Sequence, residues 1–180
     1  MAKPRIQHLE PEVADAITHW VDTLGENYGL WIWGPPRVGT TYAGYAALTE
    51  MGRLPAYAGG EAQIRACFDV YEDLRSIWDA STYSRGNASD SAGWDYRDQI
   101  DAEVTALWAV PVFMLNDWSE TVPVEFFTKH FHPLIRRRIT SCKPTLIISY
   151  FDPSVMGGQE RYYREEFVVA EVTRRGNGTG

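Results

Sequence analysis

Residues 34–41, with the sequence Gly-Pro-Pro-Arg-Val-Gly-Thr-Thr, have the residue types of a loop that binds phosphate. The two glycines are spaced as in the motif G-x-x-x-x-G-K-[ST], whose backbone N–H groups wrap a phosphate chain. In that motif a lysine reaches the outer phosphates and a hydroxyl binds magnesium. Here Thr40 stands at the lysine position, and Thr41 keeps the hydroxyl. The candidate cofactor-binding residues are therefore Gly34, Pro35, Pro36, Arg37, Val38, Gly39, Thr40 and Thr41.

The segments on either side of this loop are those that a phosphate site needs. Residues 30–33 are a short apolar run bounded by glycines, which predicts a buried strand, and residues 41–51 have helical character. The N-terminus of such a helix adds partial positive charge beside the loop. A tight connection with a threonine cap would use the same residue types, so the loop alone leaves both interpretations open.

A polar pair follows a second apolar run. Residues 111–115 predict a buried strand, and Asn116 and Asp117 come directly after it. In P-loop proteins a strand of this kind ends in a carboxylate that holds Mg²⁺ together with the loop hydroxyl. Thr41 and Asn116 are therefore the candidate metal ligands, although Asn116 offers a neutral oxygen where a hard cation favours a carboxylate. A turn that begins after the strand would also use Asn and Asp.

The remaining pattern predicts how these segments are assembled. Further strands are predicted over residues 54–58, 144–149 and 167–172, and helices over residues 11–24, 64–78, 100–108, 123–135 and 160–165. Apolar strands that alternate with helices indicate an α/β fold, in which a parallel sheet has helices on both faces. Ligands of such sheets bind at the carboxyl ends of the strands, where residues 34–41, 116–117 and 149–150 lie. Residues 79–97 predict a flexible insertion, either functional or disordered.

Length and composition limit the classes of protein to be considered. The chain has 180 residues, 44% apolar and 23% charged, which predicts a single domain with a lead-in over residues 1–10 and a tail over residues 173–180. The net charge of −7 argues against a protein built mainly to coat nucleic acid. Cys67 and Cys142 are expected to be free buried thiols of a cytoplasmic protein. No apolar run has the length of a membrane span, so we expect no membrane partner.

Three blocks of the sequence together resemble one family. Residues 29–41 resemble the opening GLxLxGPPGTGKT of the DnaC/DnaI-type helicase loaders and of the related transposition-helper ATPases, both of which are AAA+ proteins. Residues 110–118 are similar to the Walker B segment PLLxIDDLG of these proteins, and residues 134–150 resemble their sensor 1 segment LIxxRYxxxKPTIxTSN. The resemblance covers residues 13–172 and implies a P-loop fold of the AAA+ type.

Every departure from the family falls on a position of the nucleotide chemistry. Thr40, Asn116 and Tyr150 stand where the family has its lysine, its metal-binding aspartate and its sensor asparagine, while Asp117 is kept. The resemblance therefore implies Asp117, Asn116 and Tyr150 as degenerate catalytic positions. Lysine and metal stabilise the charge that develops in the transition state, so we expect weak binding of ATP and magnesium and little or no hydrolysis.

Tyr150 has a second expected effect. A tyrosine is bulkier than the asparagine of the family, so it is expected to fill part of the nucleotide cleft. Trp31, Trp33 and Trp118 are further large side chains near the expected cleft.

The resemblance implies a function in DNA replication. We expect a catalytically impaired relative of the helicase loaders, of host or phage origin, that acts by binding a replicative helicase or a loader. Single-stranded DNA and further copies of the chain are additional expected partners. The alternative is an active helicase loader or transposition-helper ATPase in which Arg37 and Asp117 compensate for the altered loop. A small P-loop kinase is disfavoured because the sensor-like block has no role there.

Two groups of arginines have expected roles outside the loop. Residues 136–138 are expected to form a solvated helix end; a contact with DNA or with the nucleotide of a neighbouring subunit is the alternative. Arg161 and Arg164 precede the last predicted strand, where AAA+ proteins place an arginine that acts between subunits. The sequence does not decide between these two arginines.

Overall fold

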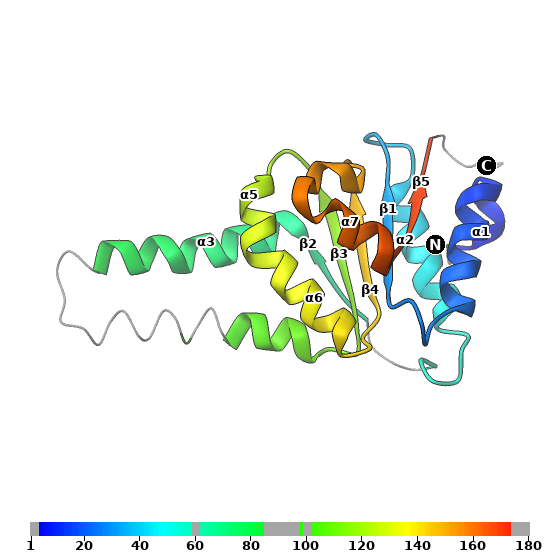
Figure 1. Cartoon of the computed structure of the whole chain (residues 1–180), viewed down its shortest axis with the longest axis horizontal. Helices are drawn as coiled ribbons and strands as arrows, with labels where there is room; N and C mark the ends of the chain where they lie inside the picture. Colours follow the sequence, from blue (N-terminus) through cyan, green and yellow to red (C-terminus); the bar gives the residue numbers. More distant parts are fainter. Residues whose placement is uncertain (1–3, 59–61, 85–97, 99–101, 174–180) are drawn as a thin grey trace.

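A parallel sheet of five strands forms the centre of the molecule (Figure 1). A computed structural model describes residues 4–58, 62–84, 98 and 102–173. The strands are β1 Gly29–Trp33, β2 Ala62–Ala66, β3 Val112–Trp118, β4 Thr145–Ser149 and β5 Phe167–Glu171. Their order is β2-β3-β4-β1-β5, and all the neighbouring strands pair in parallel. The predicted α/β fold is thereby confirmed.

Helices cover both faces of the sheet (Figure 1). The helices and turns of the described residues are η1 Ile6–His8, α1 Pro11–Asp22, α2 Thr40–Met51, α3 Cys67–Ser84, residues 102–109, α5 Val124–Phe126, η2 Phe127–Phe131, α6 His132–Thr140, η3 Pro153–Gln159 and α7 Glu160–Glu166. One core joins α1 and α2 to side chains such as Leu30, Ile32 and Met114. The other joins α3, η2, α6 and α7 to their neighbours in the strands, such as Trp31 and Leu115. Successive residues of β1 thus enter opposite cores, as strand geometry requires.

The large aromatic side chains of β1 and β3 belong to the second core. Trp31 and Trp118 are fully buried, and their ring centroids lie 5.7 Å apart. Trp118 stacks on Phe127 at 3.7 Å, and Trp33 packs against the same core. These three tryptophans, which the sequence places near the expected cleft, pack instead on the sheet face that α3, η2 and α7 cover.

The second strand lies later in the chain than the sequence predicts. Residues 54–58 form turns, and β2 begins at Ala62. Ile64, which the sequence places on a helix, pairs in register with Met114 of β3. Pro55 lacks a backbone donor, and pairing with β3 outweighs the helical periodicity that Ile64 shares with α3.

Two more helical predictions need adjustment. The predicted insertion over residues 79–97 begins with helix, because α3 continues to Ser84, whereas residues 85–97 lie outside the described residues. The helix predicted from Pro123 starts at Val124 and contains the π-helical turn η2 before α6.

Arg138 is buried, and the predicted solvated arginine cluster is therefore wrong at this residue. Its guanidinium donates hydrogen bonds to the carbonyls of Leu107, Val110 and Pro144 at 2.9–3.0 Å and to the Thr145 hydroxyl at 3.0 Å. Burial lowers its pKa to about 10. The hydrogen bonds of Arg138 thus connect the segment before β3 with the start of β4.

The two cysteines differ in their surroundings. Cys67 is buried, as predicted, and burial raises the pKa of its thiol. Cys142 is exposed in the turn before β4, with a φ of 57°, so its predicted burial is wrong. Among the described helices, none has the length and apolar character that a membrane span requires.

Candidate functional site

The loop between β1 and α2 has the backbone that its glycines predict. The Gly34 amide donates a hydrogen bond of 3.2 Å to the Ser149 carbonyl. A Cβ at Gly34 would lie 2.3 Å from the Val172 carbonyl oxygen, so a side chain does not fit between β1 and the end of β5. Arg37 has a φ of 70° and Gly39 a φ of 112°. The loop therefore turns through left-handed conformations before the helix begins.

The N-terminus of α2 points its amides toward the loop. Its first helical hydrogen bond joins the Ala43 amide to the Gly39 carbonyl at 2.9 Å. The amides of Thr40, Thr41 and Tyr42 come before this bond and have no partner within the helix. They add the partial positive charge of a helix N-terminus, the feature that holds anions in phosphate-binding loops.

A β-bulge positions the acidic residue at the end of β3. Leu115 pairs with Ile147 and Trp118 with Ser149, so β3 contains one residue more than β4 over this interval. Asp117 has a φ of 64° and is exposed, while Trp118 returns to the core. The bulge thus turns the Asp117 carboxylate away from the core that holds Trp118.

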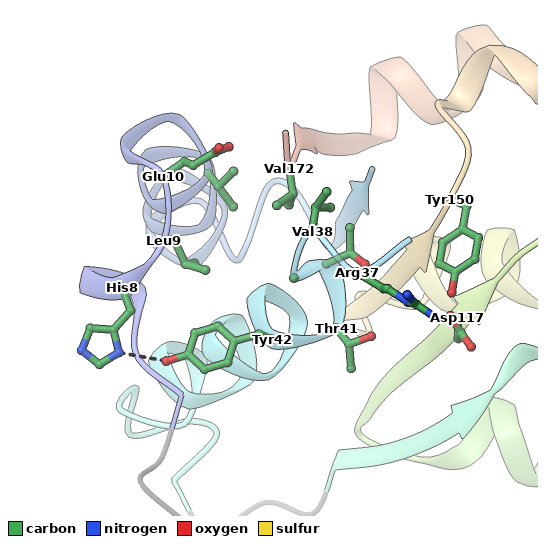
Figure 2. A pocket seen from close by; sticks show the side chains of 13 residues that line it. His8, Leu9, Glu10, Arg37, Val38, Thr41, Tyr42, Asp117, Tyr150 and Val172 are labelled. Atoms are coloured by element: carbon green, nitrogen blue, oxygen red, sulfur yellow. Dashed lines mark hydrogen bonds between the residues drawn. The ribbon is translucent and has the colours of Figure 1, made fainter. Parts of the chain in front are cut away.

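A cavity of about 450 Å³ lies between the loop, the strand ends and the start of the chain (Figure 2). Its lining includes seven of the predicted site residues, namely Arg37, Val38, Gly39, Thr40, Thr41, Asp117 and Tyr150. Gly34, Pro35, Pro36 and Asn116 are not among the lining residues. The carboxamide oxygen of Asn116 is buried and has no hydrogen-bond partner in the described part of the chain.

One end of the cavity gathers the polar side chains. Arg37 extends from the loop toward Asp117 and Tyr150, and Thr41 lies beside them (Figure 2). Hydrogen bonding with Asp117, then burial, raises the pKa of the Tyr150 phenol, and the charge of Arg37 opposes this shift. A cation, a carboxylate and two hydroxyls therefore face the same space.

The other end of the cavity was not predicted from the sequence. It is lined by His8, Leu9, Glu10, Val13, Tyr42 and Val172. The His8 Nδ1 lies 2.9 Å from the Tyr42 hydroxyl, and the Glu10 carboxylate accepts hydrogen bonds from the Thr173 amide and hydroxyl at 3.1 and 3.0 Å. These contacts join the first residues of the chain to α2 and β5. No motif marks them; only the apolar periodicity of Val13 and Val172 places two of them beside the sheet.

The residues of the site fit a phosphate group better than a divalent cation. The loop offers backbone amides, the Thr41 hydroxyl and the positive charge of Arg37. A magnesium ion would need anionic oxygens. Asn116 offers a neutral buried oxygen, and the carboxylate of Asp117 has Arg37 directed toward it.

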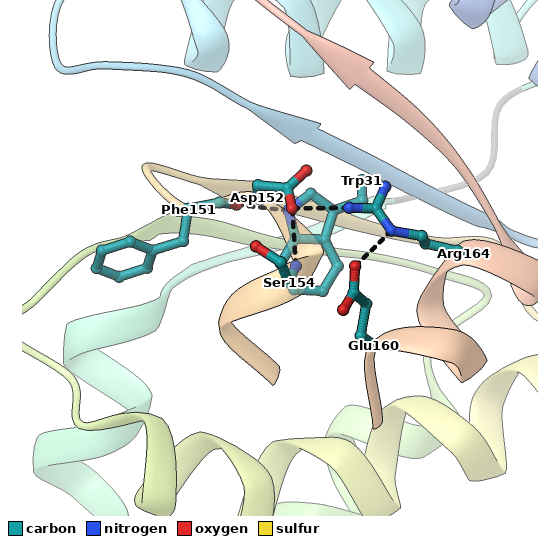
Figure 3. Close-up of polar contacts among 6 residues, drawn as sticks. All are labelled: Trp31, Phe151, Asp152, Ser154, Glu160 and Arg164. Atoms are coloured by element: carbon teal, nitrogen blue, oxygen red, sulfur yellow. Dashed lines mark hydrogen bonds and ion pairs between the residues drawn. The ribbon is translucent and has the colours of Figure 1, made fainter. Parts of the chain in front are cut away.

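The two arginines of α7 are both engaged within the chain. Arg164 pairs with Glu160 at 2.7 Å and with Asp152 at 2.8 Å (Figure 3). Arg161 pairs with Glu165 at 2.7 Å. Asp152 follows Tyr150 closely in the sequence, so Arg164 holds the segment after β4 against α7. A role of either arginine between subunits stays a prediction.

Comparisons with known proteins bear on the fold. No family model and no curated protein matches the sequence. Among solved structures, DnaI is similar with a TM-score of 0.65 and 16% identity, covering 97% of this chain and 90% of that one. The DnaC helicase loader has a TM-score of 0.63 and 16% identity, covering 94% and 96%. Domain III of the replication initiator DnaA from Thermotoga maritima has a TM-score of 0.60 and 14% identity, covering 96% and 68%.

These similarities extend over nearly the whole chain at low identity, so they establish the fold alone. The predicted resemblance to the helicase loaders is confirmed at that level, and the chain has the P-loop AAA+ fold that DnaI, DnaC and DnaA share.

Proposed function

We propose that this protein is a helicase-loader-like component of DNA replication that binds a replicative helicase or a loader and hydrolyses ATP weakly or not at all. The observation that carries the proposal is the altered polar end of the cavity in an otherwise regular AAA+ fold. The backbone of the loop is kept, while Thr40 stands at the lysine position and Arg37 extends from the loop toward Asp117 and Tyr150 at the strand ends.

The altered side chains act on hydrolysis more than on binding. A hydrogen bond to a charged group contributes about 1.5–3 kcal/mol, so loss of the lysine weakens triphosphate binding by roughly one to two orders of magnitude. Backbone amides survive the substitution and still favour an anion. Hydrolysis also requires stabilisation of developing charge by the lysine and a metal, neither of which Thr40 and Asn116 supply.

The shape of the cavity is consistent with a nucleotide. A phosphate chain would lie along the loop and the N-terminus of α2, and a base would reach the opposite end near Leu9 and Val13. Such a ligand would contact both the loop and the first residues of the chain. Nucleotide binding is then able to affect the surface that η1 and α1 present to a partner.

The proposed partners follow from the structural neighbours. One similar structure is the DnaC helicase loader, and another is the initiator DnaA bound to a nucleotide analogue and single-stranded DNA, about half of which this chain covers. We propose a replicative helicase or a loader as the principal partner, with single-stranded DNA and self-association as further interactions. A cytoplasmic location and a phage origin stay predictions.

Turnover of ATP, measured beside binding of purified replicative helicase, tests this function. We expect helicase binding, with hydrolysis near background in both the wild type and Asp117→Ala. The alternative function is an active ATPase in which Arg37 and Asp117 replace the missing groups. Turnover comparable to that of ordinary loaders, and abolished by Asp117→Ala, would establish that alternative.

A further inference from the structure

Arg37 has a position that the phosphate-loop motif does not specify. Its backbone adopts a left-handed φ of 70°, which a residue other than glycine adopts at a cost. This conformation directs the side chain into the cavity, toward Asp117 and Tyr150 (Figure 2). The guanidinium of Arg37 therefore faces the carboxylate from the loop side.

Asp117 is held where it meets this guanidinium. The bulge at the end of β3 turns the residue out of the sheet, with a φ of 64°. Immediately beyond it, the Trp118 indole donates to the Val122 carbonyl at 3.1 Å, and the Trp118 carbonyl accepts from the Tyr150 amide at 2.9 Å. These contacts of Trp118 fix the backbone from which the Asp117 side chain extends.

A divalent cation would meet unfavourable surroundings at this place. Arg37 extends from the loop toward Asp117 (Figure 2), and a second cation at the same carboxylate would be repelled by its guanidinium. Asn116 supplies no charge, and its oxygen lies outside the lining of the cavity. Of the two candidate metal ligands, Thr41 and Asn116, only Thr41 offers the group that binds magnesium in the motif, namely its hydroxyl.

We propose that Arg37 takes the place of the divalent cation, so that this cavity binds the phosphates of nucleoside di- and triphosphates in their magnesium-free form. The inference rests on the nucleotide cavity of the proposed function and adds the ionic form of the ligand. Arg37 is then a binding residue that contacts phosphate directly, with Asp117 orienting its guanidinium. A permanently charged arginine supplies this counter-charge at any metal concentration.

Calorimetric titration with ADP and with ATP, each in EDTA and in excess magnesium, tests the inference. We expect both nucleotides to bind at least about tenfold more tightly in EDTA than in magnesium. Arg37→Gln should weaken binding in EDTA by roughly one to two orders of magnitude, and Arg37→Lys should restore part of it. Tighter binding in magnesium overturns the inference, and so does the absence of binding in EDTA.

Two more variants show whether the effects belong to this site. Arg53→Gln removes an exposed arginine at the far end of α2, where it pairs with Glu50, and should leave both affinities unchanged. Asp117→Asn removes the carboxylate that orients Arg37 and should weaken binding in EDTA, though by less than Arg37→Gln does; loss of a magnesium-dependent affinity in this variant would instead identify Asp117 as a metal ligand and overturn the inference. Thermal unfolding of each variant establishes that it is folded.

Failure here is distinguishable from failure of the proposed function. Helicase binding and ATP turnover are measured on the same preparation. If helicase binds, turnover stays near background and nucleotide affinity requires magnesium, only the role of Arg37 is overturned.

Discussion

The amide of Tyr150 donates a hydrogen bond of 2.9 Å to the carbonyl of Trp118, and this bond joins the ends of β4 and β3 just beyond the bulge. It places the Tyr150 phenol beside the carboxylate that the bulge turns outward. Asp117 and Tyr150 are therefore fixed relative to each other by backbone contacts. A substitution at either side chain should change the chemistry of the cavity and leave the sheet intact.

Arg138 provides the first testable prediction, which concerns stability. Its guanidinium donates hydrogen bonds to several buried carbonyls, including those of Leu107 and Pro144. Arg138→Met should lower the free energy of unfolding by about 3–5 kcal/mol, because these acceptors would be left buried without donors. Urea unfolding measures the loss.

Arg137 offers a matched control for this experiment. It is exposed on the same helix, with its guanidinium 4.1 Å from the centre of the Trp108 ring. Arg137→Met should change the free energy of unfolding by about 1 kcal/mol or less. If the two variants lose the same free energy of unfolding, the burial of Arg138 is not the cause of the loss.

The sequence predicts the part of the site that consists of local patterns. The glycines of the loop, the apolar run of β1 and the polar pair at the end of β3 are each visible in a few neighbouring residues. Parallel topology then places Asp117 and Tyr150 at the same edge of the sheet. The bulge at Asp117 cannot be predicted from neighbouring residues, because it depends on the pairing register between β3 and β4.

Long-range contacts explain the remaining errors. Ile64 has helical spacing to the residues of α3, yet its pairing with Met114 makes it a strand residue. Glu10 reaches the cavity because it binds Thr173 at the far end of the chain. Arg138 has the sequence context of a surface cluster, and only its distant carbonyl partners reveal that it is buried.

The second prediction concerns the two positions at which this chain departs from the loop lysine and the metal-binding aspartate of the helicase loaders. Thr40→Lys together with Asn116→Asp should raise the affinity for ATP with magnesium by roughly one to two orders of magnitude, because the lysine and a metal-binding carboxylate return. Thr40 lines the cavity, and Asn116 lies at the end of β3 with a buried oxygen that lacks a partner. Calorimetric titration measures the change. A folded double variant whose affinity does not rise would show that the site is assigned wrongly.

The third prediction concerns pH. Burial, and secondarily the charge of Arg136, lowers the pKa of His132, whose Nδ1 lies 2.9 Å from the Tyr163 hydroxyl. The native state therefore favours the neutral imidazole. Burial of the neutral His132 therefore contributes fully to the free energy of unfolding at pH values above the unfolded pKa of about 6.5. This contribution is lost as the pH falls through the lower pKa that His132 has in the native state.

Chemical denaturation between about pH 7.5 and 5 measures this dependence. His132→Gln should flatten part of the decline in the free energy of unfolding at acidic pH. The pKa of His130 is also lowered, chiefly by burial, so some decline remains in this variant. An unaltered slope in His132→Gln would contradict the prediction.

The last prediction concerns the melting temperature in the presence of nucleotide. A ligand that binds the native state raises the melting temperature by an amount that grows with its concentration. Because Arg37 disfavours a metal beside Asp117, millimolar ATP with excess magnesium should leave the melting temperature unchanged, whereas the same ATP in EDTA should raise it. Gly39→Glu should abolish the rise in EDTA, since it places a carboxylate in the loop at a φ of 112°. A shift of several degrees with magnesium that Gly39→Glu removes would show instead that the cavity binds the ordinary magnesium complex.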